Sequence, residues 1–212
     1  MKNNSSPDEP SSSGLTTRRI EAFSDGVFAI VITLMAFQIK IPPIDPLFAA
    51  QQLPKALWSL WPEFYSYGLS FFMVGVYWIG HHNAYHHINR TDRPLLWFNL
   101  VSLMLVALLP FSTSLLGRYM NFQLAHIVYG VNIIVIGIAN YYQWRYARTR
   151  GLVNVKMERW FIRKTNKRLL LAPGVAVGAI LLSFINLHAS ALLYLSIILY
   201  YLFPTAIDRA VE

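Results

Sequence analysis

The chain has 212 residues, of which 55% are hydrophobic, 15% aromatic and 13% charged. Soluble domains carry about 25% charged residues, so the composition excludes an ordinary soluble domain and favours one compact domain embedded in a membrane. The net charge is +8 and there is no cysteine, which excludes disulfides, thiolate catalysis and cysteine-based metal sites.

The N-terminal segment differs from the rest of the chain. Residues 1–14 are polar and rich in serine and proline, so we expect a disordered cytoplasmic tail over 1–18 and one transmembrane domain over 19–212. The tail lacks the apolar core of a cleavable signal peptide. The first apolar run predicts a helix over 22–39, which the prolines of the segment 41–46 end.

Five further apolar runs follow, and about 20 such residues cross a hydrocarbon core. They predict helices over 56–80, 95–117, 124–144, 169–186 and 189–204. Pro110 is expected to kink the second of these, and the last two, with almost no linker, to form a tight antiparallel hairpin. The predicted fold class is therefore all-α: a polytopic membrane protein with six transmembrane helices.

The basic residues predict how this bundle is oriented. One predicted side holds fifteen Lys and Arg, nine of them within 145–168, whereas the other holds only Lys40, Lys55 and Arg118. Because Lys and Arg are retained on the cytoplasmic side, both termini are expected to be cytoplasmic. We expect the basic stretch to meet anionic lipid headgroups, not nucleic acid, either as an interfacial helix or as a solvated loop.

The first predicted helix carries a charge inside its apolar run. A carboxylate there, at Asp25, costs about 2.5–3.5 kcal/mol on insertion scales, so it needs a partner or water. Arg19 is six positions earlier and lies on another face of the helix. By orientation, the expected partners at the same depth are His81, His82 and Asn99.

A sequence pattern surrounds this aspartate. Arg19, Phe23, Ser24 and Asp25 form R-x-x-x-F-S-D, followed by GVFAIVITLMAF. The pattern is similar to the signature of the transmembrane protein 175 family, the lysosomal-type potassium channels and their prokaryotic relatives. Three further segments resemble the family at corresponding places: WIGHH at 78–82, LLWFNL at 95–100 and LLPF at 108–111.

The resemblance implies a homotetramer of six-helix subunits in a prokaryotic plasma membrane, which passively conducts K⁺ and needs no cofactor. The first helices would surround the pore, with Ile30, Leu34 and Phe37 facing it and Thr33 adjacent. The family more often has an aliphatic residue where Phe37 stands. Arg19, Phe23, Ser24, Asp25 and their partners would form a structural network that holds the pore helix at its cytoplasmic end.

The spacing of the pore positions fits this implication. Residues 30, 34 and 37 share one helix face, so four copies would stack three apolar rings along an axis. A narrow apolar constriction gates by dewetting, and hydroxyls of Thr33 would supply replacement oxygens to an ion. The same stripe on an arbitrary membrane helix packs or contacts lipid, and only the surrounding motif favours a pore.

Two other classes of function, a metal enzyme and a transporter, have some signals in the sequence. His82 and His86 have the i, i+4 spacing of a metal pair. Outside the segment 81–87 the only histidines are His126 and His188, on other predicted helices, so no metal site and no enzyme is expected. The alternative function is a secondary or proton-coupled transporter. Asp25 lies near one end of its span instead of midway, and no inverted repeat is visible, which disfavours this alternative.

Overall fold

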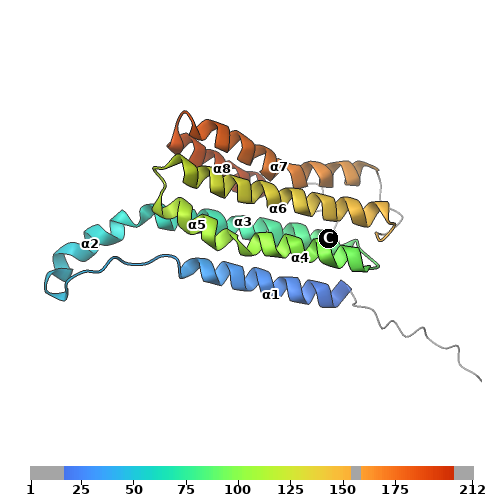
Figure 1. The fold of residues 1–212 in the computed structure, drawn as a ribbon, viewed down its shortest axis with the longest axis horizontal. Helices are drawn as coiled ribbons and strands as arrows, with labels where there is room; N and C mark the ends of the chain where they lie inside the picture. The colour runs from blue at the N-terminus through green and yellow to red at the C-terminus, as the bar shows by residue number, and fades with distance from the viewer. Residues whose placement is uncertain (1–16, 154–158, 203–212) are drawn as a thin grey trace, which may run out of the picture.

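The computed structural model describes residues 17–153 and 159–202, which form a bundle of long helices (Figure 1). A 3₁₀ turn, Pro46–Phe48, precedes the second α-helix. The eight α-helices are α1 (Thr17–Ala36), α2 (Ala49–Ser59), α3 (Trp61–His86), α4 (Arg93–Ala107), α5 (Leu109–Arg118), α6 (Gln123–Thr149), α7 (Arg159–Ser183) and α8 (Leu187–Leu202). Within the described residues, the all-α prediction is confirmed.

The first helix begins and ends earlier than predicted. It already includes Thr17 and ends at Ala36, where the amide of Gln38 bonds to the carbonyl of Met35 in a tighter turn. Phe37, assigned to the helix from sequence, therefore lies in the turn that follows it. The prolines that were expected to stop the helix come after a turn that has already ended it.

The second predicted helix is two helices. The break falls at Leu60, and α3 then continues to His86, beyond the predicted end at residue 80. Pro62 occupies the first turn of α3, where its missing N–H leaves no bond unmade. The predicted start and end were thus both wrong, because the chain breaks at Leu60, just before Pro62, and α3 runs on to His86.

The third predicted helix is interrupted near Pro110, as expected. α4 ends at Ala107 and α5 begins at Leu109, with Leu108 between them. A proline cannot donate to the carbonyl one turn earlier, which relaxes the helix there. At the other end, the carboxylate of Asp92 caps α4 by accepting a bond from the amide of Leu95 at 2.9 Å.

The basic stretch over 145–168 is mostly helical. α6 continues to Thr149 and α7 starts at Arg159, so both ends of the basic stretch belong to these two helices. Residues 154–158 lie outside the described residues, and for them the prediction of an interfacial helix or a solvated loop stays a prediction. The predicted hairpin of the last two helices is confirmed. The short turn between α7 and α8 is closed by Asn186, whose side-chain oxygen accepts from the amide of Ala189 at 3.0 Å.

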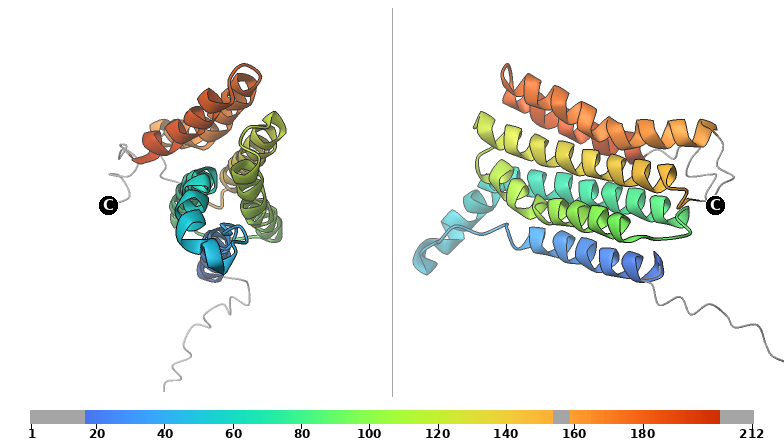
Figure 2. Two further views of the ribbon diagram at one scale, coloured as in Figure 1. Left: turned by 90° about the vertical axis from the view of Figure 1, so that its left-hand side faces the viewer. Right: turned by 45° about the vertical axis from the view of Figure 1, so that its right-hand side comes forward.

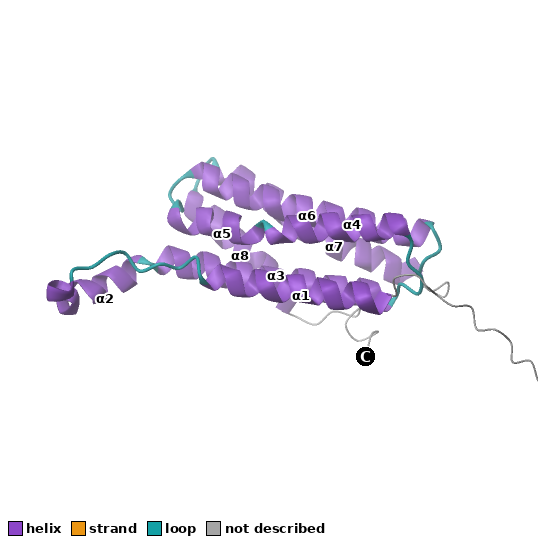
Figure 3. Ribbon diagram, turned by 60° about the horizontal axis from the view of Figure 1, so that its bottom comes forward, coloured by secondary structure: helices purple, strands orange, loops and turns teal. Residues whose placement is uncertain are grey.

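The helices pack in successive layers (Figures 1 and 2). The α7–α8 hairpin packs on α6, and α6 packs on α4 and α5, while α1 lies along the opposite edge against α3, α4 and α5. α2 projects beyond the end of the bundle and none of its side chains is buried (Figure 3).

Several helices are suited to a membrane. Among the described residues, three helical segments are long and apolar enough to cross one: Arg93–Arg118, Gln123–Thr149 and Arg159–Ser183. α8 is also apolar but has 16 described residues. α1, with 20 residues, and α3, with 26, have the length of a span, since 20 residues of helix rise about 30 Å.

Candidate pore helix and its polar support

α1 has one face inside the subunit. Its buried side chains, Ser24, Phe28, Val31 and Met35, recur every three or four residues and therefore form one stripe. The three apolar residues of this stripe join the main core with side chains of α3 and α5. This packing fixes the rotation of α1 about its own axis.

The opposite face of α1 meets nothing inside the subunit. Ile30 is 59% exposed, Leu34 47% and Phe37 75%, and Phe23, about two turns before Ile30, is exposed as well. The three predicted ring positions therefore lie together on the open side of the molecule. Phe37 does so from the turn after the helix.

Thr33 lies on this open face beside Ile30. Its hydroxyl is 2.9 Å from the carbonyl oxygen of Ile30 and 3.1 Å from that of Ala29, so its proton is used within the helix. The lone pairs of the hydroxyl oxygen stay available to a cation or water. A hydroxyl placed this way can act as an acceptor, and the role of Thr33 beside an ion stays a prediction.

A buried polar network ties the first half of α1 to three other helices. The side-chain amide of Asn99 in α4 donates to the hydroxyl of Ser24 at 3.0 Å, and its oxygen lies 2.9 Å from Nε2 of His81 in α3. Gln143 of α6 donates to Tyr85 at 2.9 Å and lies 3.4 Å from the Asn99 oxygen. Because Asn99 links all of these groups, it is the centre of the network.

The partner of Asp25 is one that the sequence reasoning missed. Nε1 of Trp78 donates to the carboxylate at 2.8 Å. His81 bonds to Asn99 instead, and the ring of His82 stacks on Trp78 at 5.9 Å. The prediction that His81 or His82 bonds to Asp25 is therefore wrong. An indole N–H one turn before these histidines was the signal, since indole can only donate.

Arg19 and Phe23 complete the motif on the open side of α1. The side chains of Arg19 and Phe23 are exposed, whereas the side chain of Ser24 is buried. The motif thus divides between two environments. Ser24 faces inward to Asn99, whereas Arg19, Phe23 and Asp25 lie at the surface of the subunit.

A second polar cluster supports the other half of α1. The hydroxyl of Thr113 in α5 lies 2.7 Å from that of Ser70 in α3 and 3.7 Å from the sulfur of Met35. Ser70 in turn bonds to the hydroxyl of Tyr129 at 3.0 Å. Nothing in the sequence marked these residues, because single hydroxyls in apolar helices are common.

The histidine-rich segment has structural contacts. Nδ1 of His87 bonds to the carbonyl of Asn83 at 2.8 Å, and its ring packs on Phe161 at 4.8 Å. His126 is buried at the other end of the bundle, between Ser190 and the carbonyl of Met120. Within the described ranges, no three His, Asp or Glu side chains are grouped so as to hold a metal ion.

These features define a class of protein. The bundle is an α-helical membrane protein in which one edge helix is anchored by polar networks and turns an apolar stripe with a hydroxyl away from its own subunit. Such a helix is built to meet something outside the subunit.

Comparison with known proteins identifies the family to which this membrane protein belongs. Residues 19–110 match the sequence model of the family described as the endosomal/lysosomal potassium channel TMEM175. A potassium channel of Chamaesiphon minutus is 36% identical over 178 residues, which cover 82% of this chain and 87% of that protein. A potassium channel of Streptomyces collinus is 36% identical over 158 residues, covering 72% and 75%. The chain belongs to the TMEM175 family, whose members are ion channels and not enzymes.

Solved structures and a human relative extend the comparison. The crystal structure of a lysosomal potassium-selective channel TMEM175 homolog from Chamaesiphon minutus superimposes with a TM-score of 0.77 at 34% identity, covering 88% of this chain and 96% of that one. The human endosomal/lysosomal proton channel TMEM175 is 32% identical over 160 residues, which cover 69% of this chain and 31% of the human protein.

Proposed function

We propose that this chain is one subunit of a potassium-selective cation channel, in which α1 helices from four copies surround a common pore. The observation that carries the proposal is the open face of α1 and the turn after it, where Ile30, Leu34 and Phe37 are exposed although another face of the helix is buried. Relatives named as potassium channels, similar over most of the chain, support the choice of ion.

The proposed topology has six spans with both termini in the cytoplasm. The spans would be α1, α3, the α4–α5 pair, α6, α7 and α8. Support comes from the basic residues near the start of α1, the end of α6 and the start of α7, which would all lie on the cytoplasmic side. The stretch over 145–168 would then lie at the level of the anionic headgroups of a prokaryotic plasma membrane.

In the proposed mechanism, the apolar rings gate and select. Water leaves a narrow apolar tube, so an ion must lose hydration to pass. K⁺ holds its water less tightly than Na⁺ and therefore loses less free energy at the constriction. The hydroxyl oxygens of Thr33, beside the rings, would replace part of the lost water. The polar network around Asn99 would hold each α1 in the rotation that points the rings at the axis.

Two other functions compete with this one. The human relative is named a proton channel, which makes H⁺ the rival permeant ion. A secondary or proton-coupled transporter is the rival mechanism, in which turnover saturates and depends on a gradient of a second ion.

Flux from reconstituted liposomes separates these functions. With a K⁺ gradient and a proton-permeable shunt, the channel predicts passive K⁺ flux that exceeds Na⁺ flux. Ile30→Asn should hydrate the constriction and lower the K⁺ preference about tenfold. Ile138→Asn, at an exposed position of α6 away from the proposed pore, is the matched control. Flux of H⁺ without K⁺, or K⁺ flux that requires a proton gradient, would reject the proposal in favour of its rivals.

A further inference from the structure

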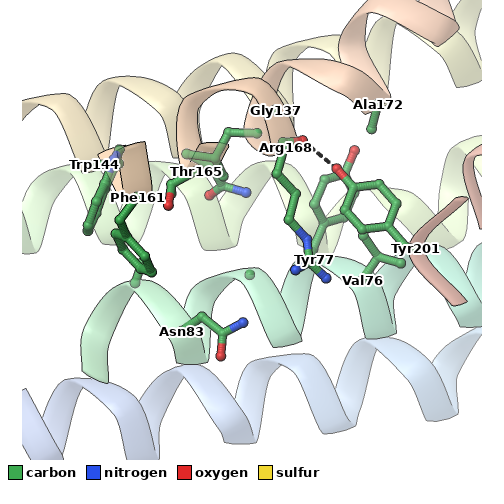
Figure 4. Close-up of a pocket in the computed structure, with 14 residues that line it drawn as sticks. Val76, Tyr77, Asn83, Gly137, Trp144, Phe161, Thr165, Arg168, Ala172 and Tyr201 are labelled. Atoms are coloured by element: carbon green, nitrogen blue, oxygen red, sulfur yellow. Dashed lines mark hydrogen bonds between the residues drawn. The ribbon is translucent and has the colours of Figure 1, made fainter. Parts of the chain in front are cut away.

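Side chains nearly fill the interior of the bundle, but a larger space lies on its surface. The cavity between α3, α6, α7 and α8 has a volume of about 60 Å³, enough for a few water molecules (Figure 4). On the surface, a groove runs along the first turns of α4, and we call it the α4 groove. It has a volume of about 460 Å³ and is lined by Arg93, Pro94, Trp97, Phe98 and Val101. This volume is within the range of small-molecule sites in proteins.

One wall of the α4 groove changes its chemistry along the helix. Arg93, Trp97 and Val101 follow one another at intervals of four residues, so they lie on one face of α4. All three side chains are exposed, and that of Trp97 is 61% exposed. From Arg93 to Val101 the helix rises about 12 Å. A charged group, an amphipathic ring and an apolar side chain therefore follow one another along a single line.

The other wall brings a second arginine to the charged end of the groove. The ring of Phe98 lies 5.2 Å from the ring of Tyr146 in α6, and the guanidinium of Arg150 lies 5.7 Å from the centre of the Tyr146 ring. The carboxylate of Asp92 is already engaged there, because it accepts from the hydroxyl of Tyr146 at 2.7 Å and from the amide of Leu95. The charged end of the groove therefore presents more positive than negative charge.

Backbone bonds hold the two segments that carry these arginines together. The amides of Asn89 and Arg90, just before α4, donate to the carbonyl of Leu152, just after α6, at 2.9 and 3.3 Å. The start of α4 and the end of α6 consequently meet at the same end of the bundle (Figure 1). The two guanidinium groups are thus presented by a joined rim of the protein.

We propose that the α4 groove binds one anionic phospholipid. The phosphate faces Arg93 and Arg150, the glycerol region lies on Trp97, and one acyl chain follows Val101. The wall thus matches a lipid from headgroup to chain, and tryptophan is enriched at the boundary between these two regions. The inference rests on the proposed topology, in which the start of α4 lies at the cytoplasmic headgroups.

The charges and the apolar wall favour a lipid over two other occupants. A soluble anion would leave the exposed faces of Trp97 and Val101 uncovered. A second copy of the chain would bring its own basic residues, at the start of α1 and of α7, toward the arginines of the groove, and like charges that meet across an interface weaken it. An anionic phospholipid satisfies both parts of the groove.

Binding is measured by native mass spectrometry on the purified, delipidated full chain, with phosphatidylglycerol, phosphatidylcholine and glycerol 3-phosphate as separate probes. Each of the two arginines is expected to favour an anionic headgroup about fivefold, so phosphatidylglycerol should bind at least tenfold more tightly than phosphatidylcholine. Glycerol 3-phosphate, which has the phosphate but no acyl chain, should not displace it. Equal binding of the two lipids, or displacement by an equal concentration of glycerol 3-phosphate, overturns the proposal.

Two variants of the groove are compared with two matched controls. Arg93→Gln should weaken the binding of phosphatidylglycerol about fivefold and leave that of phosphatidylcholine nearly unchanged. Trp97→Ala should weaken the binding of both lipids about fivefold, because apolar contact area is lost. The controls are Arg163→Gln, at an exposed position of α7, and Trp58→Ala, at an exposed position of α2. Both controls should bind the lipids as the native chain does.

If Arg163→Gln weakens binding as much as Arg93→Gln, the lipid responds only to the general positive charge of the protein and the proposal is wrong. It is also wrong if neither groove variant changes binding, which is the result expected when a second copy covers the groove. Thermal unfolding without added lipid checks that each variant folds. The binding readout is independent of K⁺ flux, so a channel that conducts but does not prefer phosphatidylglycerol rejects this inference alone.

Discussion

α1 and α6 are both apolar helices of membrane-spanning length, but they meet the rest of the bundle differently. α6 packs against α4, α5, α7 and α8, and its Gly137 is so close to α7 that an added Cβ would collide with the ring of Pro173. At Gly26 of α1, an added Cβ would meet nothing within 4 Å. α6 is packed by four helices of its own subunit, whereas α1 lies at the edge of the bundle and leaves Ile30 and Leu34 exposed. In the proposed channel, the exposed face of α1 would be the surface that a second copy covers.

The largest expected effect is at the network that joins these two helices. Asn99→Leu leaves Ser24, His81 and Gln143 without their shared partner and should lower the free energy of unfolding by about 3 kcal/mol. Ser24→Ala, which removes one hydroxyl, should cost less than half of that. Thermal unfolding in detergent measures both. Equal losses would contradict the central place of Asn99.

The two glycines sharpen the comparison directly. Gly137→Ala overpacks the contact with Pro173 and should cost about 2 kcal/mol, since a proline ring cannot move aside. Gly26→Ala should leave the stability of the subunit unchanged or slightly raised, because alanine favours a helix more than glycine does. If Gly26→Ala destabilises the fold as much as Gly137→Ala, the open face of α1 is not open.

A smaller effect is expected at the cluster of Thr113 and Ser70 behind the second half of α1. Thr113→Val removes the hydroxyl contact with Ser70 and should cost about 1 kcal/mol. Thr33→Val is the matched control, since its hydroxyl bonds only within α1. The control should keep its thermal stability but change K⁺ flux. A loss of stability in Thr33→Val that equals the loss in Thr113→Val would break the distinction between the two faces.

The smallest effect is expected at Asp25, because this side chain is exposed. Trp78→Phe and Asp25→Asn, singly and together, form a double-mutant cycle whose coupling free energy should be about 0.5–1 kcal/mol. Unfolding in detergent gives the four values. No coupling would mean that the indole does not stabilise the carboxylate.

Sequence reasoning reached the arrangement of the helices better than their ends. It placed Ser24, His81 and Asn99 at one depth, and the structure brings them together. It missed the break at Leu60, because the apolar run continues across that residue and gives no local signal of two helices. It missed Trp78 as the partner of Asp25, since the rotation of α3 depends on packing that no local pattern carries.

The pore positions show a different limit. Periodicity put Ile30 and Leu34 on one face, but the same periodicity describes a buried stripe or a lipid contact. Only the packing of Phe28, Val31 and Met35 on the other side of α1 decides which stripe is left open. The contact between Gly137 of α6 and Pro173 of α7 could not be predicted either, because it depends on how two consecutive helices pack and not on the pattern within one of them.

The absence of native cysteine allows the central claim to be tested without background labelling. Ile30→Cys is treated with a charged methanethiosulfonate reagent in reconstituted liposomes, beside Leu192→Cys, an exposed position of α8. If four α1 helices surround the pore, modification of Ile30→Cys blocks K⁺ flux and oxidation links two subunits, while Leu192→Cys conducts as before. Unchanged flux and no cross-link in Ile30→Cys would show that the open stripe of α1 does not face a pore.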